Sequence, residues 1–146
     1  MKKIANNEYF SVLKELVEEG KEVSLLVSGN SMFPFLVNER DYILFRKPTE
    51  NLKKGDMVFY QRLDGQFVMH RICSVKKEGF YIIGDGQYSI EGPVMREQIF
   101  AIITKVKRNG KWIKAGNLTW VFFQYIWINI IPIRSKIIRI YNLFKS

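Results

Sequence analysis

The chain has 146 residues, a length that accommodates one folded core with a short appendage and excludes most large enzyme scaffolds. Hydrophobic residues make up 47% and charged residues 25% of it, which excludes a disordered chain, while the irregular pattern excludes a coiled coil or collagen. The 23 basic residues outnumber the 14 acidic ones, and residues 115–146 hold four bases and no acid. Because these four are interspersed with aromatic residues and isoleucines, an anionic lipid surface is favoured over nucleic acid.

An amphipathic helix is predicted over residues 7–19, within an N-terminal element that covers residues 1–21. Asn7 is a candidate cap and Gly20 a candidate stop, and the apolar side consists of Tyr9, Val12, Leu13, Leu16 and Val17. The residues after Lys2 and Lys3 are polar rather than apolar, so no cleavable signal peptide or N-terminal anchor is visible. The default compartment is therefore the cytoplasm.

A β-rich domain is predicted over residues 22–114. Short runs of β-branched and aromatic residues alternate there with turn signals, at residues 22–27, 41–46, 57–62, 67–75, 80–83 and 99–108. Asp64-Gly65 and Asn109-Gly110 separate extended runs, and such pairs tolerate the positive φ of tight hairpins. The fold class is thus mainly β, a mostly antiparallel sheet or partial barrel. The single cysteine, Cys73, excludes an intrachain disulfide and has too few companion ligands for a zinc site.

Residues 115–146 form the third element, a hydrophobic and basic helical segment. No charge occurs between Lys114 and Arg134, and this stretch is apolar on all sides of a helix, which is typical of a membrane-embedded helix or one buried against a partner. At 19 residues, with Pro132 near its end, it is marginal for a bilayer span. The isoleucines after it share one side of a helix, and Arg134, Arg139 and Lys145 lie mostly opposite, as in a helix lying on an anionic membrane. The alternative is that residues 115–146 cover the sheet as ordinary core.

Ser31 is the candidate nucleophile. The stretch from Ser28 to Pro34 follows a predicted strand and gathers Gly, Asn, Ser and Pro, which favours a tight loop with an exposed hydroxyl and free backbone N–H groups. A serine becomes nucleophilic only when a neighbouring base removes its proton and donors stabilise the oxyanion. A solvated serine in an ordinary turn is the alternative, because short motif matches are weak.

The chain's single histidine, His70, is the candidate base. It lies in an alternating run and shares a face with Val68 and Ile72, so a partly buried imidazole is expected; a core histidine without a catalytic role is the alternative. Asp85, flanked by two glycines at the end of a strand, is a candidate to orient that imidazole or to close a turn, and Glu91 is its competitor.

These segments together resemble the signal peptidase and LexA-type self-cleaving repressor superfamily over roughly residues 25–105. The resemblance rests on four boxes in order and spacing: Ser31-Met32-Phe33-Pro34, Gly55-Asp56-Met57-Val58, His70-Arg71-Ile72 and Gly84-Asp85. It implies a β-rich peptidase fold with Ser31 as nucleophile and His70 as general base. The residue pair His70-Arg71 is similar to the endoplasmic-reticulum-type branch, whereas most bacterial signal peptidases use lysine. Asp85 matches the Gly-Asp box, and Glu91 is the alternative third member.

Three departures from the family pattern bear on function. Gly29 stands where signal peptidases commonly place a serine, so Asn30 or Ser28 is expected to help the Ser31 backbone N–H bind the oxyanion. The usual N-terminal anchor is replaced by an apolar segment near the C-terminus, which favours a membrane-associated protein with its site on the cytoplasmic face. No DNA-binding helix pair or self-cleavage Ala-Gly precedes the core, which disfavours a repressor.

The resulting prediction is a serine endopeptidase that cleaves a leader or signal segment bound as an extended strand at an open sheet edge. The alternative is a catalytically inactive peptide- or membrane-binding module of the same fold. No cofactor and no nucleic-acid partner are expected.

Overall fold

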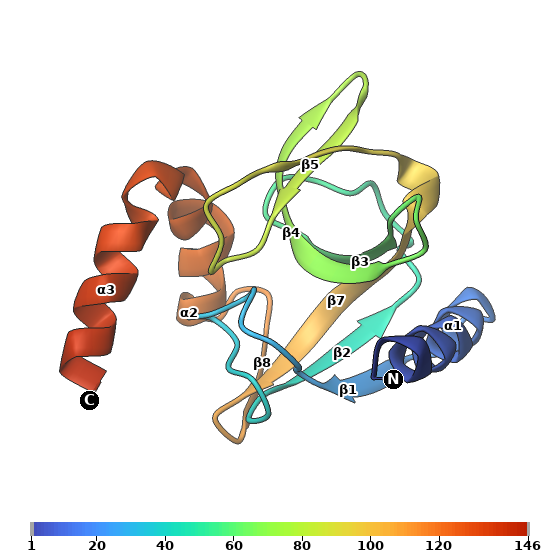
Figure 1. The fold of residues 1–146 in the computed structure, drawn as a ribbon, viewed down its shortest axis with the longest axis horizontal. Helices are drawn as coiled ribbons and strands as arrows, with labels where there is room; N and C mark the ends of the chain where they lie inside the picture. Colours follow the sequence, from blue (N-terminus) through green and yellow to red (C-terminus); the bar gives the residue numbers. More distant parts are fainter. Residues whose placement is uncertain (1, 146) are drawn as a thin grey trace.

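Eight strands form one antiparallel sheet in the computed structural model (Figure 1), which describes residues 2–145 and, among them, the side chains of residues 8–144. The sheet order is β1-β2-β7-β3-β4-β5-β6, and β8 pairs with β7. This confirms the predicted fold class. The strands are β1 (Val23–Leu26), β2 (Tyr42–Arg46), β3 (Met57–Gln61), β4 (Phe67–Lys76), β5 (Gly79–Ile83), β6 (Glu91–Val94), β7 (Ile99–Arg108) and β8 (Lys111–Lys114).

The six strands expected from the sequence are all present, each within one residue of the predicted ends. The hairpin between β7 and β8 turns at Asn109 and Gly110, which both have positive φ, 50° and 85°, as a two-residue turn requires. The sequence did not predict β6, because Gly92-Pro93 within it is typical of a turn. Proline is tolerated there because β6 is an edge strand, which among the described residues pairs with β5 alone.

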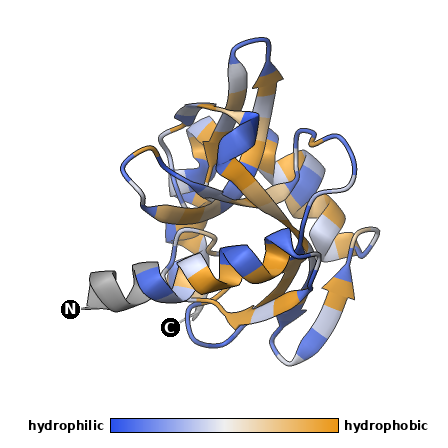
Figure 2. Cartoon of the chain, turned by 90° about the vertical axis from the view of Figure 1, so that its right-hand side faces the viewer, coloured by the Kyte–Doolittle hydropathy of each residue, from blue (hydrophilic) through white to orange (hydrophobic). Residues whose placement is uncertain are grey.

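Helix α1 (Lys2–Glu18) begins earlier than the predicted start at residue 7. Asn7 is therefore inside the helix rather than its cap, and its side chain lies outside the described ones. The residues before it include lysine and alanine, which are good helix formers, so nothing ends the helix there. Leu13 and Val17 are buried and Phe10 packs against the core, whereas Tyr9 and Val12, expected on the apolar side, are exposed. Figure 2 shows both hydrophobic and hydrophilic residues along this helix.

Two main clusters of buried side chains lie on the bent sheet. The larger cluster joins α1 and strands β2, β3 and β7 to aromatic side chains of the C-terminal segment, and the smaller one lies among β3 to β7. Irregularities in the register of β2 with β7, β3 with β7 and β4 with β5 bend the strands. The sheet therefore encloses side chains on both sides without closing into a barrel.

The C-terminal segment divides into short helical pieces rather than one long helix. They are α2 (Leu118–Val121), the π-helical turn η2 (Phe122–Ile126), the 3-10 turns η3 (Trp127–Asn129) and η4 (Ile131–Ile133), and α3 (Arg134–Lys145). Trp120, Phe123 and Trp127 are buried in the larger cluster, so this part forms ordinary core, the alternative in the sequence analysis. Among residues 2–145, no helix combines the length and the apolar character needed to cross a bilayer. In Figure 1, α3 lies at the side of the sheet opposite α1.

Candidate active site

Ser31 lies in a loop that buried apolar side chains hold firmly. The loop follows β1, and Met32, Phe35 and Leu36 are all 1% exposed or less. The Leu36 backbone N–H donates to the Met32 carbonyl at 2.9 Å, which makes this part of the loop a tight turn. Ser31 itself is half-buried and lines a cavity of about 480 Å³. The loop therefore presents its hydroxyl-bearing residue at a hollow while its neighbours anchor it in the core.

His70 reaches the same cavity from the middle of the sheet. It lies on β4 opposite Val58 of β3, and it is 5% exposed, between the buried residues Val68 and Ile72. The expected partly buried imidazole is thus present. The ring of Tyr60, two residues along β3 from the partner of His70, lies with its centroid 6.4 Å from that of the imidazole.

Gly84 separates the backbone of Ser31 from the ring of His70. A Cβ atom at this position would lie 3.1 Å from the His70 Cδ2 atom and would collide with the carbonyl oxygen of Ser31. Gly86 also lies against the loop, since a Cβ atom at this position would lie 2.7 Å from the Phe33 carbonyl oxygen. The Gly86 backbone N–H donates to the Ser31 carbonyl at 2.8 Å. The glycines on either side of Asp85 therefore allow the turn after β5 to pack directly on the Ser31 loop and the imidazole.

The surroundings of His70 keep its imidazole neutral. Burial lowers the pKa of His70 from 6.5 to about 4, the charge of Glu91 opposes this by raising the pKa, and the charge of Arg62 lowers it further. The ring atom Nδ1 is buried without a hydrogen-bond partner among the described residues. The Tyr60 hydroxyl lies beside Glu91 and Arg62 but outside hydrogen-bonding geometry, and burial raises its pKa above the ordinary value.

The two candidate acids both pair with arginines. Asp85 is fully buried and accepts two hydrogen bonds from Arg71, at 2.8 and 2.9 Å, and no hydrogen bond joins it to His70. Glu91 accepts two from Arg62, at 2.6 and 3.0 Å. Arg62 holds the pKa of Glu91 below its ordinary value, so Glu91 carries a negative charge close enough to His70 to affect its titration. Of the two, Glu91 is the acid whose field acts on the imidazole.

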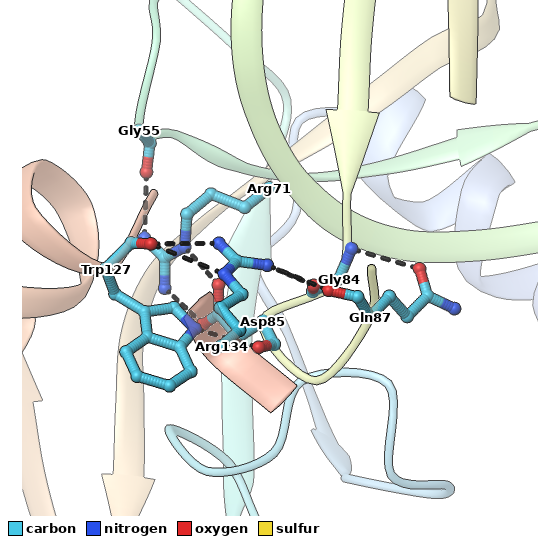
Figure 3. A network of polar contacts seen from close by, with 7 residues as sticks. All are labelled: Gly55, Arg71, Gly84, Asp85, Gln87, Trp127 and Arg134. Atoms are coloured by element: carbon cyan, nitrogen blue, oxygen red, sulfur yellow. Dashed lines mark hydrogen bonds and ion pairs between the residues drawn. The ribbon is translucent and has the colours of Figure 1, made fainter. Parts of the chain in front are cut away.

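Arg71 and the residues that contact it form a buried support behind the site (Figure 3). Besides its ion pair with Asp85, Arg71 donates to the Gly55 carbonyl at 2.9 Å, and its guanidinium lies 5.3 Å from the centre of the Phe35 ring. A bidentate arginine on a carboxylate fixes the orientation of both groups. The arginine that follows the histidine in this sequence therefore links the turn after β5 to the loop before β3.

The C-terminal segment completes this support. The Trp127 indole N–H donates to the Asp85 carbonyl at 2.8 Å, and Arg134 donates to the carbonyls of Gly84, Gln87 and Trp127 at 3.0 to 3.4 Å (Figure 3). The prediction that Arg134 lies on an outward basic face was wrong, because it is fully buried and its donors are satisfied by backbone carbonyls. Sequence spacing gave no signal for the contacts with Gly84, Asp85 and Gln87, since these join residues more than 40 positions apart.

The oxyanion candidates lie on different sides of the Ser31 loop. Ser28 lines the same cavity as Ser31, whereas Asn30 lines a second cavity of about 330 Å³ with Phe33 and Gly86. Sequence reasoning missed Tyr60 and Arg62 near the imidazole. The hairpin between β3 and β4 turns over residues 63–65, which brings Val58 opposite His70 and places Tyr60 diagonally from it. A two-residue turn at Asp64-Gly65 would shift this register by one residue, so the sequence pair alone did not indicate these neighbours.

A known family model matches most of the chain. The family model described as Peptidase S24-like matches residues 1–107, which include the Ser31 loop, His70, Asp85 and Glu91. No curated protein matches the sequence. The C-terminal segment that carries Trp127 and Arg134 lies beyond the matched residues.

Proposed function

Because the chain belongs to the Peptidase S24-like family, we propose that it is a serine endopeptidase in which Ser31 attacks a peptide carbonyl and His70 accepts the serine proton. The observation that carries this proposal is that Ser31 and His70 line one cavity, with Gly84 fitted between the Ser31 backbone and the imidazole. A nucleophile and a base that share a hollow are the minimum that acyl transfer needs.

The imidazole would act through Nε2, the ring nitrogen bonded to the Cδ2 atom that faces Gly84 and the Ser31 backbone. Attack by the Ser31 hydroxyl oxygen forms the acyl bond as the proton passes to Nε2, which then returns it to the leaving amine. In the second step Nε2 takes a proton from water and the water oxygen bonds to the acyl carbon. The bond between that carbon and the Ser31 oxygen then breaks as Nε2 returns the proton to Ser31. His70 is neutral at neutral pH, and the negative charge of Glu91 would stabilise the imidazolium that forms when it accepts the serine proton.

The sheet edges beside the cavity support an extended peptide as substrate. In the described part of the chain, β1 pairs with β2 alone and is an edge strand. β5 pairs with β4 from Arg71 onward, so residues 67–70 of β4 have no described strand beside them on that side. Leu25 and Leu26 of β1 and Phe67 and Met69 of β4 line the cavity between these edges. A peptide strand placed there would pair with one or both edges and insert apolar side chains, which suits the apolar part of a leader or signal segment.

The test is cleavage of a proteome-derived peptide library, with the cut sites read by mass spectrometry. Wild-type protein should cut a defined set of peptides, and Ser31→Ala and His70→Gln should each abolish the cuts. Ser89→Ala, at an exposed serine that does not line the Ser31 cavity, is the matched control and should cut as wild type does. Cleavage at the wild-type rate by either site variant would overturn the proposal.

The pH profile adds a second criterion. Because burial lowers the pKa of His70 to about 4, the acid limb of kcat/KM should lie near that pH rather than near 6.5. A limb that persists unchanged in a variant without the histidine would assign it to another group.

A second candidate function is a peptide-binding module without catalysis. It is favoured by the low pKa of His70, its unpartnered Nδ1 atom and the engagement of Asp85 by Arg71, which together leave the imidazole without an orienting carboxylate. Under this alternative, wild type and Ser31→Ala bind the same extended peptides with equal affinity, and neither cuts them.

A further inference from the structure

One face of α3 carries exposed apolar side chains that none of the described elements covers. Residues spaced three and four apart lie within about 60° of one another around a helix that turns about 100° per residue. Four apolar residues of η4 and α3 fall in this pattern and are exposed by a third or more, up to 87% for the last; together they form the α3 stripe, Ile133, Ile137, Ile140 and Phe144.

A different face of the same helix contacts the protein. Arg134 is buried, Ile138 packs against the larger core cluster, and the ring of Tyr141 lies 5.7 Å from that of Phe33. The rotation of α3 is therefore fixed by its contacts with the Ser31 loop and the turn after β5. The α3 stripe lies about 100° around the helix from these contacts, and this packing leaves it exposed.

The charge around the α3 stripe is wholly positive. Lys136 and Arg139 are exposed beside it, and neither forms an ion pair with a described residue. Residues 1–97 contain 14 bases and 14 acids, so the entire net charge of +9 lies in residues 98–146, which contain no acid. An apolar strip flanked by unpaired cations on a chain segment without acids is complementary to a surface that is apolar below and anionic above.

We propose that the α3 stripe binds the surface of a bilayer that contains anionic lipid, with α3 parallel to the surface. The four apolar side chains enter the boundary between head groups and acyl chains, and Lys136 and Arg139 contact lipid phosphates. A second copy of the chain is a poorer occupant, because two such faces would bring like charges together. Since Tyr141 contacts Phe33, lipid binding would hold the Ser31 loop close to the bilayer.

Sedimentation with unilamellar vesicles tests the proposal on the whole chain. Wild type should bind vesicles of phosphatidylcholine and phosphatidylglycerol more tightly than vesicles of phosphatidylcholine alone, and added salt should weaken this binding. The double variant Ile137→Ser/Ile140→Ser should bind at least about tenfold more weakly, because two aliphatic side chains that would enter the bilayer are lost. Lys136→Glu/Arg139→Glu should lose about tenfold or more on anionic vesicles only.

Matched variants separate this inference from folding and from catalysis. Leu63→Ser removes a 93% exposed leucine from the hairpin between β3 and β4 and should bind lipid as wild type does. Ser31→Ala should also bind normally, so failure of the proposed peptidase activity would leave this inference intact. Equal sedimentation of wild type with and without anionic vesicles would overturn it, as would normal lipid binding by Ile137→Ser/Ile140→Ser. Self-association that is lost in the same double variant, without lipid binding, would assign the stripe to a second copy instead.

Discussion

Burial of His70 predicts a pH dependence of stability that can be isolated because the chain has a single histidine. The ordinary pKa of 6.5 applies to the unfolded chain, and the folded value is about 4. Between these pH values the unfolded chain binds more protons than the folded one, so stability is lost as the pH falls through this window. A tenfold change in proton affinity is equivalent to about 1.4 kcal/mol, so full protonation costs about 3 kcal/mol.

The perturbation is His70→Gln, which keeps a polar side chain but cannot titrate. Urea unfolding of wild type and variant at about pH 7.5 and about pH 4 gives four free energies of unfolding. Because the carboxylates titrate in both proteins, the difference between the two pH-induced losses reports the histidine, and wild type should lose about 2 to 3 kcal/mol more than the variant. Losses that agree within about 0.5 kcal/mol would refute the reasoning that the imidazole is desolvated, and an NMR titration of the one imidazole would show the same directly.

Three substitutions test the support of the site. Gly84→Ala should lower peptide cleavage by about 100-fold or more, because the new methyl group displaces the Ser31 loop. Gly65→Ala, strained at positive φ but with open space around it, should retain activity, and equal loss in both variants would contradict the steric argument. Arg71→Met should lower the free energy of unfolding by about 3–5 kcal/mol by leaving Asp85 buried and unpaired, and Arg71→Met combined with Asp85→Leu should recover most of that loss in urea unfolding. Trp127→Phe keeps an aromatic ring but removes the indole N–H, which leaves the Asp85 carbonyl without its donor. Thermal unfolding should report a loss of about 1–3 kcal/mol, and an unchanged Tm would show that this hydrogen bond is dispensable.

Local patterns predicted the strands well because each strand is specified by nearby residues. The turn pair Asn109-Gly110 and the alternation around His70 depend only on local backbone geometry and on which face is buried, and both agree with the structure. β6 was missed because Gly92-Pro93 has poor strand propensity, and pairing with β5 overrides that propensity.

Contacts between distant segments could not be predicted in the same way. Arg134 was placed on a solvated face because its helix is amphipathic, yet hydrogen bonds to Gly84 and Gln87 bury it. Asp85 has the sequence context of a group that orients a histidine, and the arginine next to that histidine pairs with it instead. Helical periodicity and motif spacing carry no information about which of two neighbouring cations an acid will contact.

The contacts of Trp127 and Arg134 with the turn after β5 form late during synthesis, because both residues lie near the C-terminal end of the sequence. A ribosome makes residues 1–107 first, so the sheet and the Ser31 loop emerge before the residues that donate to the carbonyls of the turn after β5. The nascent chain therefore holds its serine and histidine for a time without the hydrogen bonds that fix the turn between them. Translation itself delays the mature geometry until the later residues have emerged.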